Sequence, residues 1–353
     1  MRKGISLSQQ SVRLAVDAPM PMTEPDSAAA LELLVPGLRG PIPLSPDARP
    51  ATPVLDLLLS RGLETEGVGD GLTPALLAAF GAEASAPYCL AADDPDWDRS
   101  GFWLHADPVH LRPDRDRLRL FDARHLGISR SEAEALAVEF NTHFTADGLR
   151  LVAPVASRWY LHVEPDPVLE CEPLERVIGQ PIDGFLPTGP DARRWASLMN
   201  EAQMLLFQSA VNQRRESEGR PAVNGLWTWG GGRWRSPAIA PDLILSGQPL
   251  ARGLALAAGV QQQPPHQLTS PLPRRTLVVW DQLQDAVLDA DERAWLAAAE
   301  ALDRWLAPLP DALRSGALGE LKLSDCDGRG WRITAKGLRR FWRRPRPLVQ
   351  RLS

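Results

Sequence analysis

Cysteine, tyrosine and histidine are scarce in this chain, with three, two and six copies among 353 residues. Cys89, Cys171 and Cys326 lie far apart and show no CxxC spacing, which argues against a disulfide framework or a structural zinc site and favours a reducing compartment. No apolar run approaches the roughly 18 residues of a membrane span, and the N-terminus lacks the apolar core of a signal peptide. We therefore expect a cytoplasmic protein without a membrane partner.

The rest of the composition is that of an ordinary globular protein, with 44% hydrophobic and 24% charged residues. A chain of this length usually needs more than one core, so two domains or one large domain with an insertion are expected. The net charge of −5 argues against nucleic-acid binding by the chain as a whole.

Changes in hydrophobic pattern divide the chain into parts. Helices are expected over 54–62 and 72–81, each ended by a glycine, and a buried strand over 276–281. These elements lie on either side of a region with a different hydrophobic pattern, which indicates an α/β core interrupted by an α+β insertion. The predicted parts are a flexible tail (1–28), a discontinuous core (29–90 and 236–328), the inserted domain (91–235) and a basic C-terminal segment (329–353).

Within the predicted insertion, Ser129 and Glu132 form the capping box of a helix, and two strands are expected over 149–154 and 158–163. The period of two in the second strand puts Trp159, Leu161 and Val163 on one face. The other face then presents a row that could bind an anion, or that could equally be a solvated or interdomain face. This row consists of Arg158, Tyr160 and His162.

The helix expected from about residue 192 is apolar nearly all round, which predicts that it is buried. Asn200 would then need hydrogen-bond partners, because a bare buried amide costs roughly 1–3 kcal/mol. Two further helix and turn predictions concern aspartates. Asp289 with Glu292 is expected to cap a helix, and Asp107 is expected to cap or turn the chain before Pro108.

Several stretches resemble the archaeal-type, cofactor-independent phosphoglycerate mutases. Asn212, Arg215, Gly219 and Asn224, followed by LWTWGGG, are similar to a motif in the domain inserted into that family's core. FDARHLGISRSEAEAL and DGLRLVAPVASRWYL resemble two further segments of that family and follow each other in the same order. FWLHADPVHL, RWYL, NEAQM and LWTWGGG resemble more closely a bacterial offshoot, the regulatory proteins of RpfE type. The similarity covers most of residues 50–345 and is specific between about 100 and 232.

The resemblance implies an alkaline-phosphatase-like core and a site with two divalent metals, Mn²⁺ or Mg²⁺, and a hydroxyl nucleophile. The sequence departs from that pattern. Pro36 stands where the first metal-binding aspartate is implied, Ser45 and Thr52 sit in no convincing nucleophile motif, and no histidine follows His266. Asp325 precedes a cysteine instead of a histidine. The remaining weak metal candidates are Asp281, Asp285 and Asp325.

We therefore expect a degenerate core that binds no metal cofactor and an insertion that kept its motifs. Asn200, Asn212, Arg215 and Asn224 either hold the insertion's fold or line a pocket for a small phosphorylated or carboxylate ligand. The three glycines at 230–232 are expected to form a turn, the alternative being an anion-binding backbone nest.

The basic C-terminal segment has nine Lys or Arg and no Asp or Glu from Arg329 onward. One interpretation is contact with nucleic acid or another acidic surface. The other is that the segment lies on the acidic body with Trp342 as its anchor. Three functions follow: a non-catalytic regulatory or anion-sensing protein, which could also have a protein partner; an active metal-dependent mutase converting 3- to 2-phosphoglycerate; and a nucleic-acid-binding regulator.

Overall fold

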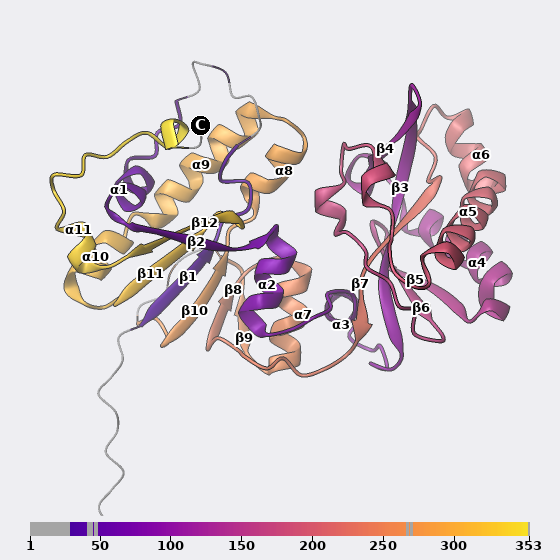
Figure 1. Cartoon of the computed structure of the whole chain (residues 1–353), viewed down its shortest axis with the longest axis horizontal. Helices are drawn as coiled ribbons and strands as arrows, with labels where there is room; N and C mark the ends of the chain where they lie inside the picture. The colour runs from indigo at the N-terminus through magenta and orange to yellow at the C-terminus, as the bar shows by residue number, and fades with distance from the viewer. Residues whose placement is uncertain (1–28, 41–44, 46–48, 266–267, 269–270, 352–353) are drawn as a thin grey trace, which may run out of the picture.

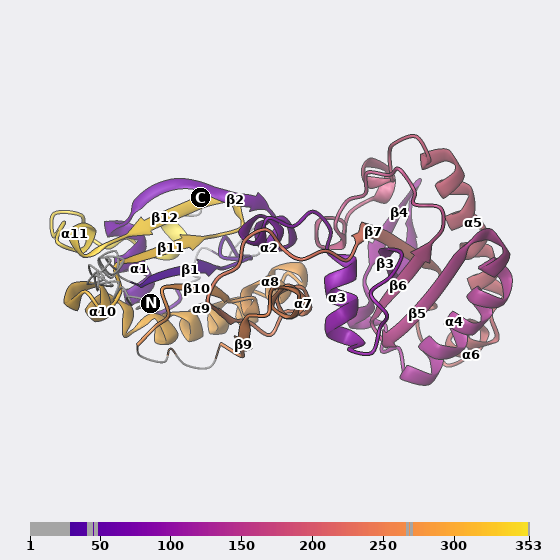
Figure 2. The same cartoon turned by 90° about the horizontal axis from the view of Figure 1, so that it is seen from below.

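A computed structural model of the chain describes residues 29–40, 45, 49–265, 268 and 271–351. The predicted flexible tail lies outside the described residues. The described chain forms two bodies, each built on its own sheet, which lie side by side (Figures 1 and 2). The mixed α/β fold expected from the sequence is confirmed. No helix within the described ranges is both long and apolar enough to cross a membrane.

The first body, called the core here, contains a seven-stranded sheet of order β2-β12-β11-β1-β10-β8-β9. β11, β1, β10, β8 and β9 run parallel, whereas β12 and β2 are antiparallel additions at one edge. The strands are β1 (Ala30–Leu34), β2 (Leu63–Asp70), β8 (Leu243–Leu245), β9 (Gln261–Gln263), β10 (Arg275–Val279), β11 (Glu320–Ser324) and β12 (Asp327–Ile333).

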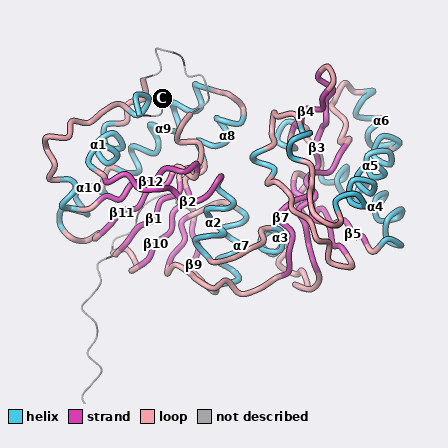
Figure 3. The backbone as a smooth tube through the Cα atoms, viewed as in Figure 1, coloured by secondary structure: helices cyan, strands magenta, loops and turns pink. Residues whose placement is uncertain are grey.

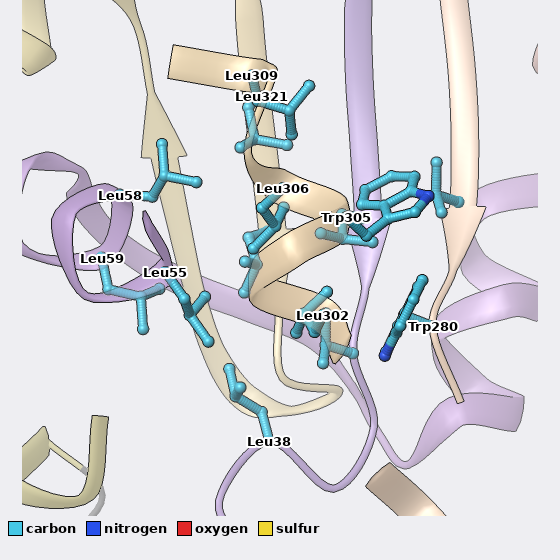
Figure 4. Close-up of a cluster of buried hydrophobic side chains, with 14 of the residues drawn as sticks. Leu38, Leu55, Leu58, Leu59, Trp280, Leu302, Trp305, Leu306, Leu309 and Leu321 are labelled. Carbon is cyan, nitrogen blue, oxygen red and sulfur yellow. The ribbon is translucent and has the colours of Figure 1, made fainter. Parts of the chain in front are cut away.

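Helices cover both faces of this sheet, which explains why β1 and β10 read as nearly continuous apolar runs. One face packs against α1 (Pro53–Arg61), α8 (Gln282–Leu288), α9 (Glu292–Leu306), α10 (Leu309–Ser315) and α11 (Ala335–Leu338). Figure 4 shows part of this cluster, in which Leu302 and Leu306 of α9 lie near Leu55 of α1. The other face packs against α2 (Leu72–Phe80), α3 (Ala86–Asp93) and α7 (Pro249–Ala258).

The second body, called the insert, is built on five strands: β3 (Phe102–Asp114), β4 (Arg117–Phe121), β5 (Leu149–Val155), β6 (Arg158–Val163) and β7 (Gly225–Arg233). The long strand β3 is central and pairs antiparallel with β4, β6 and β7. One face is covered by α4 (Arg130–Phe144), α5 (Ala192–Gln208) and α6 (Ala210–Ser217), on the side far from the core (Figure 3). The capping box at Ser129 is confirmed.

Three local predictions are wrong. Glycines 230–232 lie inside β7 rather than in a turn, because the strand passes close to the chain that enters the insert. A Cβ at Gly232 would lie 2.4 Å from the Cβ of Ala84. Asp107 lies within β3 and forms no turn. The N-cap of α9 is Asp291, whose side chain accepts from the Ala294 amide at 2.9 Å, whereas Asp289 ends α8.

The prediction that α5 is buried all round is also wrong. Trp195, Ala202 and Leu206 are buried, but Met204 and Phe207 are 61% and 73% exposed. Neighbouring elements cover only one stripe of this helix, so its second apolar stripe faces solvent. Asn200 is exposed on that open side and needs no buried partner.

Candidate functional site

The carboxyl ends of the neighbouring parallel strands β11, β1 and β10 meet at one edge of the core sheet. In open α/β sheets, ligands bind outside this edge. A cleft of about 350 Å³ lies there, between loops of the core and residues 175–176 of the insert. Its charged lining residues are Arg39, Asp70, Glu175, Arg176, Asp325 and Asp327.

Pro36 and Gly37 follow β1 and line this cleft. Proline offers no side-chain ligand at the position where the resemblance implies a metal-binding aspartate. Gly37 has a φ of +78°, and a Cβ there would lie 2.8 Å from the carbonyl carbon of Leu283. The loop after β1 is thus pressed against α8 by backbone packing, and the Trp295 indole further fixes it by donating to the Gly37 carbonyl at 2.8 Å.

Asp325 follows β11 and holds the turn into β12. Its Oδ1 accepts from the backbone amides of Asp327 at 2.8 Å and Arg329 at 2.9 Å. The side chain is buried, and Oδ2 has no partner among the described atoms. Burial raises the pKa of this carboxyl. Asp325 therefore caps the β11–β12 turn through Oδ1, while Oδ2 has no hydrogen-bond partner among the described atoms.

The aspartates near α8 are joined to other side chains. Gln248 donates to Asp281, while Arg124 of the insert lies 3.4 Å from Asp285 and 3.0 Å from Asp289. His125 Nε2 is also 3.0 Å from Asp289. Asp285 and Asp289 thus contribute to the contact between insert and core, whereas Asp281 is bonded within the core.

The residues at this edge do not fit the two-metal site that the resemblance implies. Within the ranges that the structure describes, no group of three or more His, Cys, Asp or Glu is placed to hold a metal ion. The candidate hydroxyls do not line the cleft either. Ser45 donates to Glu292 at 2.6 Å, and Thr52 is buried and bonded to Asp56.

Glu175 is a cleft residue that the sequence analysis missed. It comes from the insert, yet its Oε1 accepts from the Thr73 amide in the first turn of α2 at 3.0 Å. Its Oε2 accepts from Gln284 Nε2 of α8 at 3.2 Å. Burial raises the pKa of Glu175. This single side chain ties the insert to two core helices, and nothing periodic in the sequence marks it.

Arg39 and Arg176 line the cleft from opposite bodies and were also missed. Arg39 pairs with Asp327 at 2.9 Å, and Arg176 pairs with Asp70 at 3.1 Å and with Glu172 at 2.9 Å. The side chains of Asp327, Asp70 and Glu172 are 57%, 70% and 39% exposed. Exposed pairs of this kind contribute little stability, so either guanidinium can exchange its partner for a bound anion.

The motif residues of the insert form hydrogen bonds with backbone groups. The Asn212 amide donates to the carbonyls of Leu206 and Val223 and accepts from the Val223 amide, all within 2.7–2.8 Å. Asn224 exchanges two hydrogen bonds with the backbone of Leu111 in β3. These asparagines therefore fix the loop before β7 and its pairing.

Arg215 is 1% exposed and joins three segments. It donates to the carbonyls of Pro221 and Leu126 and to Glu132 Oε2 at 3.1 Å. Although burial opposes it, hydrogen bonds from Ser129 and Arg220 and the charge of Arg215 lower the pKa of Glu132 to about 2. Asn200 is exposed, and together with Asn224 it lines an open hollow beside Met204 and Phe207.

Arg158 and Tyr160 of β6 point toward α3, so this side of the strand is an interdomain face. Arg158 binds Asp93 at the end of α3 through two hydrogen bonds of 2.8 and 2.7 Å, and the Tyr160 hydroxyl donates to the same carboxylate at 2.7 Å. Arg158 and Tyr160 are therefore engaged with a buried carboxylate of the protein itself. His162 lies farther along, edge-on to Trp103.

His105 and Asp107 of β3 are buried on the same face. The His105 ring stacks on Trp229 at 4.1 Å, and Trp229 Nε1 donates to Asp107 Oδ2 at 2.7 Å. Both ring nitrogens of His105 and Oδ1 of Asp107 lack partners among the described atoms. Burial, assisted by Arg158, lowers the pKa of His105 to about 3, and burial raises the pKa of Asp107 to about 7.

Comparison with known proteins gives partial matches, and no family model matches the chain. Over 228 residues it is 25% identical to the 2,3-bisphosphoglycerate-independent phosphoglycerate mutase of Methanosarcina acetivorans, covering 59% of this chain and 57% of that protein. It is 26% identical over 230 residues to a probable enzyme of the same name from Geobacter sulfurreducens, with the same coverage. The chain is similar to cofactor-independent phosphoglycerate mutases. It spans little more than half of their length.

Among solved structures, the PH0037 protein from Pyrococcus horikoshii matches with a TM-score of 0.51 at 15% identity. The match covers 87% of this chain and 88% of that one. At this identity the match establishes a shared fold, and the mixed α/β architecture is consistent with an alkaline-phosphatase-like core.

Proposed function

We propose that this protein is a non-catalytic regulatory protein of RpfE type, derived from a cofactor-independent phosphoglycerate mutase, which senses a small phosphorylated or carboxylate anion. We place it in the cytoplasm, where its three free cysteines stay reduced. The proposal does not require a metal cofactor.

The proposal rests on one observation. The polar residues at the carboxyl edge of the core sheet have structural roles within the protein. Asp325 caps a turn, Asp285 and Asp289 pair with Arg124, and proline occupies position 36. Catalysis by two metals needs several free carboxylate and imidazole ligands around a shared centre. An edge whose acids already have protein partners supports binding without turnover.

The cleft offers means of recognising an anion. Arg39 of the core and Arg176 of the insert both line it, and guanidinium groups bind phosphate and carboxylate by paired hydrogen bonds. An anion bound to both would link the two bodies. The raised pKa values of Glu175 and Asp325 favour their neutral forms, which lessens the repulsion that two carboxylates would exert on such a ligand.

The enzymatic alternative is tested by assaying conversion of 3- to 2-phosphoglycerate with Mn²⁺ or Mg²⁺. We expect no turnover above that of a sample lacking protein. Robust turnover that Asp285→Ala abolishes would overturn the proposal in favour of an active mutase with a rearranged carboxylate site.

Anion sensing is tested by calorimetric titration of the full chain with 3-phosphoglycerate and with inorganic phosphate. Arg39→Gln and Arg176→Gln should each weaken binding about tenfold, because each removes a charge-assisted hydrogen bond. Arg314→Gln, on the exposed helix α10, is the matched control and should bind like the unmodified chain. Equal affinity in all four proteins would place the anion elsewhere.

A further inference from the structure

The last residues of α11 and the chain that follows form a basic segment, called the basic loop here and defined as residues 336–346. It contains six cationic residues and no acidic one. Within the part of the chain that the structure describes, none of the six forms an ion pair with a carboxylate. They are Lys336, Arg339, Arg340, Arg343, Arg344 and Arg346.

Two aromatic side chains stand in the middle of this charge. Phe341 is 79% exposed and Trp342 is 67% exposed. Their rings contact each other edge to face, with centroids 5.3 Å apart. The expectation that Trp342 anchors the segment on the body is therefore wrong. Large exposed apolar side chains surrounded by polar ones are typical of interaction sites.

The anchors of the basic loop lie at its two ends. Leu338 and Leu348 are buried in the cluster that covers one face of the core sheet. Ser60 of α1 accepts from the Arg346 amide at 3.0 Å, and Arg343 donates to the Gly62 carbonyl at 3.1 Å. The ends are fixed, so the loop presents its aromatic pair in a defined position.

The position of the loop favours a flat partner. It runs along the outer margin of the core, at the end of the molecule remote from the insert (Figures 1 and 2). A planar surface can touch this margin without touching the rest of the protein. A nucleic-acid strand must continue beyond the loop, and residues 1–328 carry a net charge of −14, that is −5 minus the +9 of residues 329–353. That charge repels a polyanion.

We infer, contrary to the expectation from the sequence that the protein has no membrane partner, that the basic loop attaches it peripherally to an anionic lipid surface. Its cations meet the negative head groups, whose attraction falls off within a Debye length. Phe341 and Trp342 enter the boundary between head groups and acyl chains, where aromatic rings are favoured. The cleft between core and insert stays open, because it lies toward the other end of the molecule.

The test is co-sedimentation of the full chain with vesicles of phosphatidylcholine alone or mixed with phosphatidylglycerol. The unmodified chain should sediment with the mixed vesicles only, and less at high salt. Two variants should each reduce the bound fraction about tenfold or more. One carries Arg339→Gln, Arg340→Gln and Arg344→Gln, and the other carries Phe341→Ser and Trp342→Ser.

The matched control removes the same kinds of exposed side chain from the insert, with Arg193→Gln, Arg194→Gln, Arg214→Gln and Phe207→Ser. It should sediment like the unmodified chain. Absence of binding to mixed vesicles, or equal binding by the loop variants, would overturn the inference. Tighter binding of a thymidine oligonucleotide than of the vesicles, lost in the same loop variants, would overturn it in favour of nucleic acid.

Discussion

In the insert, the side-chain oxygen and nitrogen of Asn212 both have backbone partners, whereas at the carboxyl edge of the core sheet one oxygen of the buried Asp325 has none. The insert thus uses its polar motif residues to close loops onto helices and strands. At the core edge, Asp325 caps a turn, and Asp285 and Asp289 contact the insert. The motifs through which this chain resembles phosphoglycerate mutases therefore report how the insert folds. These motifs do not indicate whether the core edge can catalyse a reaction.

The largest expected effect is at Arg215. Replacing it in Arg215→Leu leaves Glu132 and two carbonyl groups without their buried partner, which should lower the free energy of unfolding by about 3–5 kcal/mol. Chemical denaturation measures this. Arg214→Leu removes an exposed arginine from the same helix and should change stability by less than about 0.5 kcal/mol. Similar effects of the two variants would contradict a structural role for the motif.

The second effect concerns pH, at His105 and Asp107. The lowered pKa of His105, about 3, means that its contribution to stability is lost as pH falls through 6.5, the unfolded value. The raised pKa of Asp107, about 7, means that its contribution is present below 3.8 and lost as pH rises toward 7. Between about pH 4 and 6.5 the two slopes oppose each other, because in this range the unfolded chain has given up the Asp107 proton and holds one on His105.

Single variants should separate these slopes. Relative to the unmodified chain, the free energy of unfolding of Asp107→Asn should rise with pH by about 1.4 kcal/mol per unit over this range. That of His105→Gln should fall by a similar amount. Denaturation at several pH values measures both. Slopes of the same sign would show that these two groups do not titrate as their burial beside Arg158 and Asp122 implies.

A smaller effect is expected at the core edge. Asp325→Asn keeps the oxygen that accepts from two amides and removes a buried charge. The raised pKa of Asp325 means that the charged form costs stability as pH rises above the unfolded value. The variant should therefore be more stable at neutral pH, by about 1 kcal/mol. Asp327→Asn, at an exposed neighbour, is the control. A loss of stability in Asp325→Asn would mean that its charge is needed.

The smallest effect is at Phe207. Phe207→Ser should change the free energy of unfolding by less than about 0.5 kcal/mol, because the ring is mostly exposed. Leu206→Ala, one position earlier in the same helix, should cost about 2–5 kcal/mol. Thermal or chemical denaturation of both variants tests which stripe of α5 faces the interior.

Local sequence signals predicted many elements. The Ser129–Glu132 capping box is formed, and the period of two over 158–163 placed Trp159 and Tyr160 on the correct opposite faces. These signals work because hydrogen bonds and burial repeat at short range. The exposed stripe of α5 was missed because periodicity reveals an apolar face without showing whether any neighbour covers it.

The cleft was only partly predictable. Asp325 was identified through a resemblance, but its use as a turn cap depends on the β11–β12 pairing, and β12 was not expected. Glu175 and Arg176 reach the core edge from a segment more than 100 residues away, and single polar residues in loops carry no periodic signal. Such long-range contacts follow from the packing of the two bodies.

The most direct test is equilibrium dialysis of the full chain against MnCl₂, followed by measurement of bound manganese. If the carboxyl edge of the core sheet has lost its ability to hold two cations, the protein should retain less than one equivalent, unchanged in Asp281→Asn and Asp325→Asn. Two tightly bound ions per chain, lost in either variant, would contradict the account.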